Sequence, residues 1–134
     1  MSAEKVIYAL IESHTPLTAI VSTRIYAGSI PQDSALPAIA YDHVSTIELT
    51  TIDANSEYAL VSSRIQVTVA TNNYPQLKNI ITLIRKACNY KRGTINGVIV
   101  NSITRELIGP DFKSEDQSLY FQTIDFKVLY HESN

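Results

Sequence analysis

An alternation of apolar and polar residues in the middle of the chain sets the strongest limit on its fold. The apolar members are Val61, Ile65, Val67 and Val69, and the polar members between them are Ser62, Arg64, Gln66 and Thr68. Successive side chains of a β-strand point to opposite faces of the sheet. This spacing therefore predicts a strand with one buried face and one wetter face.

Three segments have the helical spacing needed to cover such a sheet. The first runs from Ser2, which is placed to cap it, to about residue 14, with apolar residues three and four apart. Thr15 and Pro16 are expected to cap and begin a short second helix. The third helix carries a broad apolar stripe from Leu77 to Cys88. We expect it to begin after the caps Asn72 and Asn73 and to be closed by Lys91, Arg92 and Gly93.

The remaining segments predict three more strands. These strands span residues 38–47, 98–105 and 118–131, and the second follows the tight-turn pair Asn96-Gly97. In the last of them Gln122 interrupts the inward face, while Asp125 and Lys127 point the other way. Residues 24–37 are expected to be extended and broken by turns, because they contain a glycine and two prolines.

The predicted element order is helix, helix, strand, strand, helix, strand, strand. Short connections between the strand pairs favour antiparallel neighbours. We therefore predict one α+β domain over residues 1–134, with an antiparallel sheet of about four strands packed against helices on one face.

Composition excludes several classes of function. The 134 residues contain 11 basic and 13 acidic side chains, giving a formal net charge of −2. The chain therefore lacks the excess of positive charge that tight binding to a nucleic-acid duplex requires. The start of the chain lacks the pattern of a signal peptide, and no apolar run is long enough for a membrane span. A single cysteine fits a reducing compartment, and we expect the protein to be made in a cytoplasm.

Charged residues are only 18% of the chain, below the usual share of about 25%. Uncharged polar residues take their place, with 25 serines and threonines. Interface cores are depleted in charge, so a lightly charged surface is suited to burial against a partner.

No catalytic, metal or nucleotide motif emerges. His14, His43 and His131 lie in different predicted elements without metal-ligand spacing, and Cys88 lies on an apolar helix stripe, where it is interpreted as a core residue. The four glycines form no phosphate-binding loop. The acidic residues of segment 111–116 lack the spacing of a calcium loop and are interpreted as a solvated loop. We expect no enzyme activity and no cofactor.

Residues 24–41, which read RIYAGSIPQDSALPAIAY, resemble the signature of small tail-completion proteins, also called tail terminators, of long-tailed bacteriophages and prophages. Further segments agree with that family in order and spacing. They are the opening helix, the short helix at residues 16–19, the strand at 63–67, the helix through 85–87, the turn at 92–98 and the closing strand at 125–128.

The resemblance implies a structural virion protein without catalytic residues. Such a subunit forms a ring, commonly of six copies, at the head-proximal end of the tail tube, where it ends tube polymerisation and joins the tail to the head. Its implied partners are other copies of itself, the tail tube protein and a head-side neck or connector protein, with no membrane. DNA passes through without specific binding. Six copies carry a net charge of −12, six times −2, which disfavours sticking of the polyanion.

A closed ring needs contacts between two different faces of the subunit. We expect one of these faces to include five residues of the apolar segment: Tyr26, Ile30, Pro31, Leu36 and Pro37. The alternative is that these residues cover the domain's own core. The acidic candidates for the lumen or rim of the ring are Asp53, Glu57, Asp111, Glu115 and Asp116.

Two other functions remain open. One is a head-side connector or stopper ring. The other is a small dimeric α+β domain that binds a ligand between sheet and helix.

Overall fold

The computed structural model describes residues 2–49, 58–113 and 119–133, which form a mixed α/β fold. The helices are α1 (Ser2–Ser13), α2 (Thr15–Val21) and α3 (Tyr74–Cys88). The strands are β1 (Ile25–Ala27), β2 (Ala38–Leu49), β3 (Tyr58–Thr71), β4 (Gly93–Ile95), β5 (Val98–Ile108), β6 (Phe112–Lys113) and β7 (Tyr120–Ser133).

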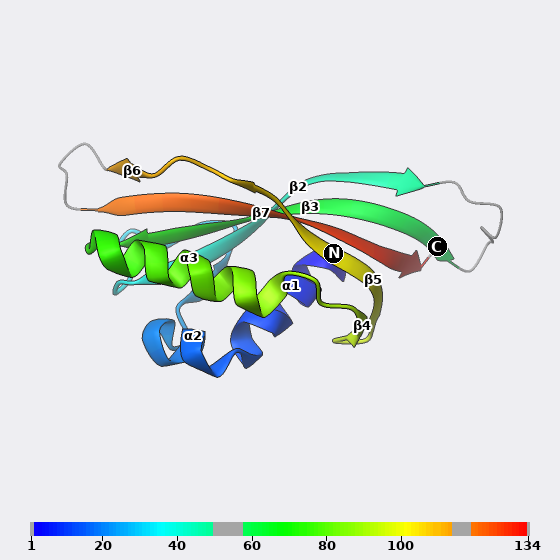
Figure 1. Ribbon diagram of the computed structural model, residues 1–134, viewed down its shortest axis with the longest axis horizontal. Helices are drawn as coiled ribbons and strands as arrows, with labels where there is room; N and C mark the ends of the chain where they lie inside the picture. The colour runs from blue at the N-terminus through cyan, green and yellow to red at the C-terminus, as the bar shows by residue number, and fades with distance from the viewer. Residues whose placement is uncertain (1, 50–57, 114–118, 134) are drawn as a thin grey trace.

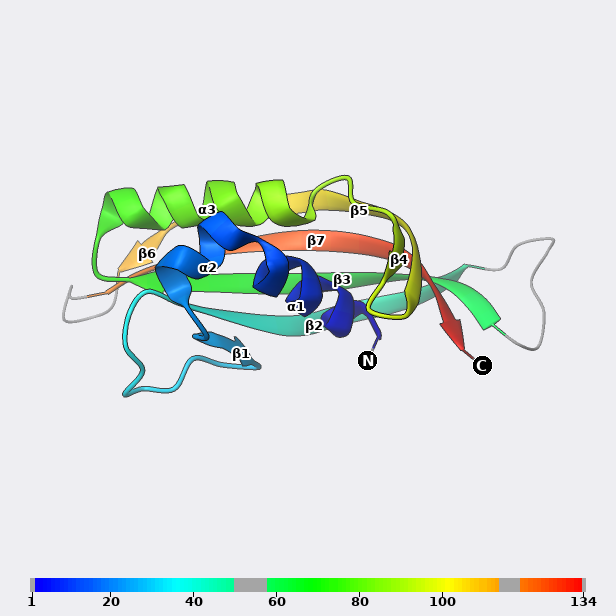
Figure 2. The ribbon, with the colours of Figure 1, turned by 90° about the horizontal axis from the view of Figure 1, so that it is seen from below.

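The fold has two layers, a curved sheet and a layer of three helices. Figure 1 shows α1, α2 and α3 together on one side of the sheet, and Figure 2 shows α3 running along the strands above β5 and β7. We call the opposite side of the sheet the helix-free face. The predicted covering of one face by helices is therefore confirmed.

The sheet has more strands than predicted. Its order is β1-β2-β3-β7-β5-β4, and β6 pairs with β7. The four long strands lie over the four predicted segments, but the prediction of about four strands and the predicted element order were wrong. The missed strands β1, β4 and β6 have three, three and two residues, too few to show a period of two. β1 also pairs parallel to β2, so the sheet is not purely antiparallel.

Local caps explain where the helices begin and end. Asn73 is the N-cap of α3, and its side chain accepts a hydrogen bond from the backbone N–H of Gln76, as predicted. The N-cap of α2 is His14 rather than Thr15, and it makes no side-chain cap. α3 ends at Cys88 and not at Gly93, which is the first residue of β4. The turn predicted at Asn96-Gly97 joins β4 to β5, with positive φ at both residues.

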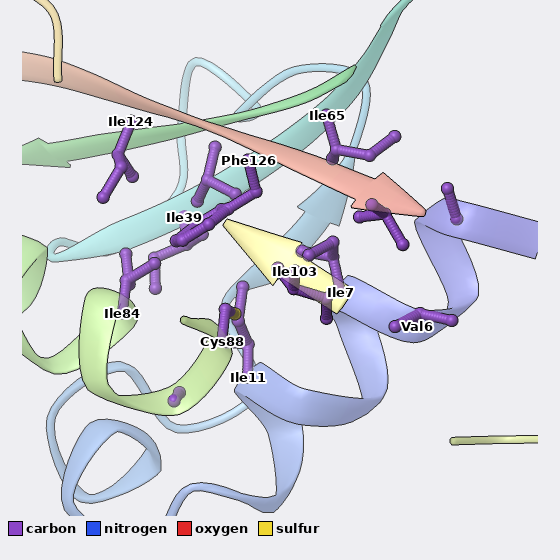
Figure 3. Close-up of a cluster of buried hydrophobic side chains, with 14 of the residues drawn as sticks. Val6, Ile7, Ile11, Ile39, Ile65, Ile84, Cys88, Ile103, Ile124 and Phe126 are labelled. Carbon is purple, nitrogen blue, oxygen red and sulfur yellow. The ribbon is translucent and has the colours of Figure 1, made fainter. Parts of the chain in front are cut away.

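The core lies between the helices and the sheet. Figure 3 shows Ile7 and Ile11 of α1 and Ile84 of α3 directed toward Ile39, Ile103 and Phe126 of the sheet. All of these side chains are fully buried. On β3 the predicted inward residues Val61, Ile65, Val67 and Val69 are buried, as the alternation predicted, whereas Ser62, predicted on the wetter face, is buried too.

Gln122 interrupts the inward face of β7, as predicted, and the structure shows why it is tolerated. Its Nε2 donates to the carbonyl oxygen of Gly109 at 2.9 Å, and its Oε1 accepts from Nζ of Lys78 at 3.0 Å. A buried amide must find such partners, because an unpaired polar group costs about 1–3 kcal/mol. This side chain thereby ties α3 and the end of β5 to β7.

Ile7→Ala tests this core. The substitution leaves a cavity beneath the sheet, and we expect it to lower the free energy of unfolding by about 2–5 kcal/mol, measured by urea denaturation. Ile99→Ala is the matched control, because Ile99 is 54% exposed. Equal losses from both variants would contradict the packing described here.

Candidate functional site

The helix-free face carries a trough formed by four strands. Its cavity of about 270 Å³ has β2 and β5 as walls and β3 and β7 as its floor. The lining residues are Ile47, Leu49, Ser62, Ser102, Thr104, Lys127 and Leu129. The trough is thus partly apolar although it faces away from the core.

An ion pair crosses the floor of the helix-free face. Nη2 of Arg64 lies 2.7 Å from Oδ2 of Asp125, and Nε of Arg64 donates to the same oxygen at 2.8 Å. The Asp125 side chain is almost fully buried, so the guanidinium compensates for its lost hydration. The sequence places Arg64 and Asp125 on the wetter sides of two strands, but only the pairing of β3 with β7 brings them together.

The predicted interface residues lie in and around the loop between β1 and β2. The hydroxyl of Tyr26 and Oγ of Ser34 are hydrogen-bonded at 2.9 Å across this loop. The carbonyl oxygen of Pro37 accepts from Nε of Arg24 at 2.8 Å, and Pro37 itself is buried. This residue therefore belongs to the interior of its own subunit.

The other members of the predicted interface come together at one cavity. Ile30, Pro31 and Leu36 line a hollow of about 350 Å³ with Ala70, Leu119 and Phe121 at the ends of β3 and β7. Pro31 is exposed, and Ile30 and Leu36 are half-buried. These three side chains are accessible enough to contact another protein.

The acidic candidates are only partly described. Asp111 is exposed and pairs with Lys78, with Nζ 3.3 Å from Oδ1. A hydrogen bond from its own backbone and then one from Lys78 hold the pKa of the Asp111 carboxyl below its usual value. Asp53, Glu57, Glu115 and Asp116 lie outside the described residues.

The two long edges of the sheet differ. Within the described residues β1 pairs with β2 only at residues 39–41, and residues 43–49 of β2 are all exposed. The edge of β5 is instead covered by β4 at residues 98–100. Beyond β4, the backbone N–H of Tyr90 donates to the carbonyl oxygen of Ile103 at 2.7 Å, and Oδ1 of Asn89 accepts from the backbone N–H of Arg105 at 3.0 Å.

The open edge of β2 was not found by sequence reasoning. Its alternation resembles that of any half-buried strand, and nothing local shows that no neighbour covers it. Among the residues that the structure describes nothing pairs with this edge, which makes it a template for strand pairing with another chain.

Hydroxyl groups connect β2 to the core through a chain of hydrogen bonds. The ring of His43 bonds to Oγ1 of Thr46, which lies 2.8 Å from Oγ of Ser63, and Ser63 is 3.1 Å from the hydroxyl of Tyr130. Burial raises the pKa of Tyr130 to about 12. This phenol therefore stays protonated at neutral pH and satisfies the polar groups buried around it.

The structure does not assemble the histidines into a site. Across residues 2–49, 58–113 and 119–133, no group of three or more His, Cys, Asp or Glu side chains is placed to hold a metal ion. Cys88 is fully buried, as its place on the apolar stripe predicted. None of the helices formed by these residues is long and apolar enough to cross a membrane.

Comparisons with known proteins give one family and a larger set of similar solved structures, two of which are described below. Residues 5–131 match the family described as tail completion protein gp17. A chain from the virion of a native gene transfer agent particle is 12% identical, with a TM-score of 0.78 over 95% of this chain and 92% of that one. Another solved chain is 10% identical, with a TM-score of 0.59 over 97% of this chain and 96% of that one. At such identities the two structures show the fold alone. No curated protein matches the sequence.

The reactivity of Cys88 tests its assignment to the core. Burial raises the pKa of the thiol to about 12, so almost no thiolate exists at pH 8. We expect a thiol reagent at pH 8 to leave the folded protein unlabelled and to label it fully in denaturant, as measured by mass spectrometry. Rapid labelling of the folded chain would show that this side chain is accessible.

Proposed function

The chain belongs to the tail completion protein gp17 family and is a structural protein of the phage tail, and we propose that its copies form a closed ring at the head-proximal end of the tail tube. In this position the ring ends tube polymerisation, presents its other end to a head-side neck protein and lets DNA pass through its centre. The ring is proposed to contain six copies.

The observation that carries the proposal is the number of large apolar side chains that strands expose. Seven of them, on β2, β5 and β6, have between 36% and 63% of their surface exposed: Val44, Ile47, Leu49, Ile99, Leu107, Ile108 and Phe112. Large exposed apolar surfaces in a soluble protein mark contacts with other molecules. The proposed subunit contacts two ring neighbours, the tail tube and a neck protein. It therefore needs several such contact surfaces.

A ring also needs two unlike contact faces on each subunit. We propose that the accessible part of the β1–β2 loop, formed by Ile30, Pro31 and Leu36 with the side chain of Tyr26, belongs to one of them. Pro37 is not proposed as a contact, because it is buried within its own subunit.

The acidic residues Asp53, Glu57, Glu115 and Asp116 are proposed to lie at the lumen or the rim of the ring. Acidic side chains in a narrow conduit repel the DNA phosphates and keep the passing duplex from sticking. Asp111 contributes less to this repulsion, because Lys78 pairs with it.

The loop contact is tested by replacing both Ile30 and Leu36 with aspartate. Charges at a buried interface cost several kcal/mol, so we expect a folded monomer under conditions in which the wild-type chain assembles. Light scattering measures the oligomeric state and circular dichroism the fold. An unfolded product would instead assign these side chains to the core of the subunit.

The role in the virion is tested by removing the gene from the phage that encodes it. We expect tail tubes of irregular, excessive length that are not joined to heads, as seen by electron microscopy, and restoration by the chain supplied from a plasmid. Tubes of normal length with heads attached would contradict the proposed function.

A further inference from the structure

The described charges are distributed unequally between the two long edges of the molecule. Figure 2 shows β1 and β2 along one edge and α3 with β5 along the opposite one. Residues 2–49, which form α1, α2, β1 and β2, contain five acidic side chains and two basic ones. Residues 85–106, at the end of α3 and in β4 and β5, contain five basic side chains and one acidic one.

We call the first of these the acidic edge. Its five carboxylates are Glu4, Glu12, Asp33, Asp42 and Glu48. Glu48 is exposed near the end of β2. Helix α1 packs against β2, where the ring centroids of Tyr8 and Tyr41 are 5.8 Å apart, and also against α3 and β4. Glu4 and Glu12 are one helical turn before and after Tyr8, so they share this side of the helix.

The cations on this edge do not neutralise it. The guanidinium of Arg24 is turned into its own subunit, where Nε donates to the carbonyl oxygen of Pro37 and Nη2 to that of Ile20. Lys5 is the other cation, and it is exposed on α1. The acidic edge therefore keeps a negative excess next to the open strand edge of β2.

We call the opposite side the basic edge. Its five cations are Arg85, Lys86, Lys91, Arg92 and Arg105, and all five are exposed. The bonds from Asn89 and Tyr90 to β5 hold the segment after α3 against the sheet, so these cations are presented together. The side chain of Tyr90 projects from the same segment and is 79% exposed. Tyrosine and arginine, together with tryptophan, are enriched at the energetic centres of interfaces.

From this polarity we infer that the ring contact joins the basic edge of one copy to the acidic edge of the next, with the Tyr90 segment seated beside residues 43–49 of β2. The inference rests on the proposed ring and names its two unlike faces. Opposite charges on opposite edges favour head-to-tail contacts, the kind from which a ring is built when the rotation between neighbours closes. They disfavour two-fold contacts, in which an edge meets a copy of itself and like charges face each other.

The test uses two variants of the full chain that change the charge of one edge each. Lys91→Glu with Arg92→Glu brings the net charge of residues 85–106 from +4 to 0, and Glu12→Lys with Glu48→Lys brings that of residues 2–49 from −3 to +1. All four side chains are exposed, so circular dichroism should show the wild-type fold. Light scattering and native mass spectrometry are carried out on the wild type and on each variant, alone and with tail tubes.

We expect each variant alone to assemble at least about tenfold more weakly than the wild type, because the attraction between its two edges is lost. Mixing the two variants should restore assembly, with the two chains alternating. The control Lys113→Glu lies on β6, which pairs with residues 120 and 121 of β7. This is the end of β7 remote from the Tyr90 segment and from residues 43–49 of β2, so the control should assemble as the wild type does.

The outcome of this experiment distinguishes failure of the edge assignment from failure of the proposed ring. If the wild type forms rings and the mixture of variants does not assemble, the assignment of the two edges is overturned and the ring stands. If the control loses assembly as strongly as the edge variants, net charge rather than edge polarity is responsible, and the inference is also overturned. A wild-type chain that stays monomeric both alone and on tail tubes overturns the inference together with the proposed ring.

Discussion

Burial of one face of a curved sheet under three helices is the constraint on which the rest of the structure depends. The inward side chains of β2, β3, β5 and β7 form a single core with α1 and α3, so the sheet cannot bury its other face within the same subunit. A two-layer fold of this size always leaves one sheet face to water or to a partner. In this protein that face holds the trough, the Arg64–Asp125 pair and exposed apolar side chains.

The two edges of the sheet follow from the same arrangement. α3 runs along the strands and ends beside β5, so the segment that leaves it covers the backbone of Ile103 and Arg105. β2 lies at the other side, where β1 covers only three residues. The asymmetry is useful in a ring subunit, because a heterologous contact requires two sides that differ in shape and charge.

The candidate site illustrates how far sequence reasoning extends. The apolar segment around Ile30 and Leu36 was recognised from its composition, and the structure gathers these side chains at one cavity. The sequence did not distinguish the buried Pro37 from the accessible Ile30 and Leu36, because the residues of this segment look equally apolar. The open edge of β2 and the basic edge around Tyr90 were missed, since both depend on which strands lack neighbours and not on any local pattern.

The sequence by itself determined the three helices, the four long strands and the resemblance to tail-completion proteins, because periodicity, caps and turns act over a few residues. Asn73 and the pair Asn96-Gly97 are examples whose role is set by their immediate neighbours. Only the tertiary structure decided the strand order, the short strands, the partners of Gln122 and the pairing of Arg64 with Asp125. These features join residues up to 75 positions apart, so their energies depend on a packing that no local segment encodes.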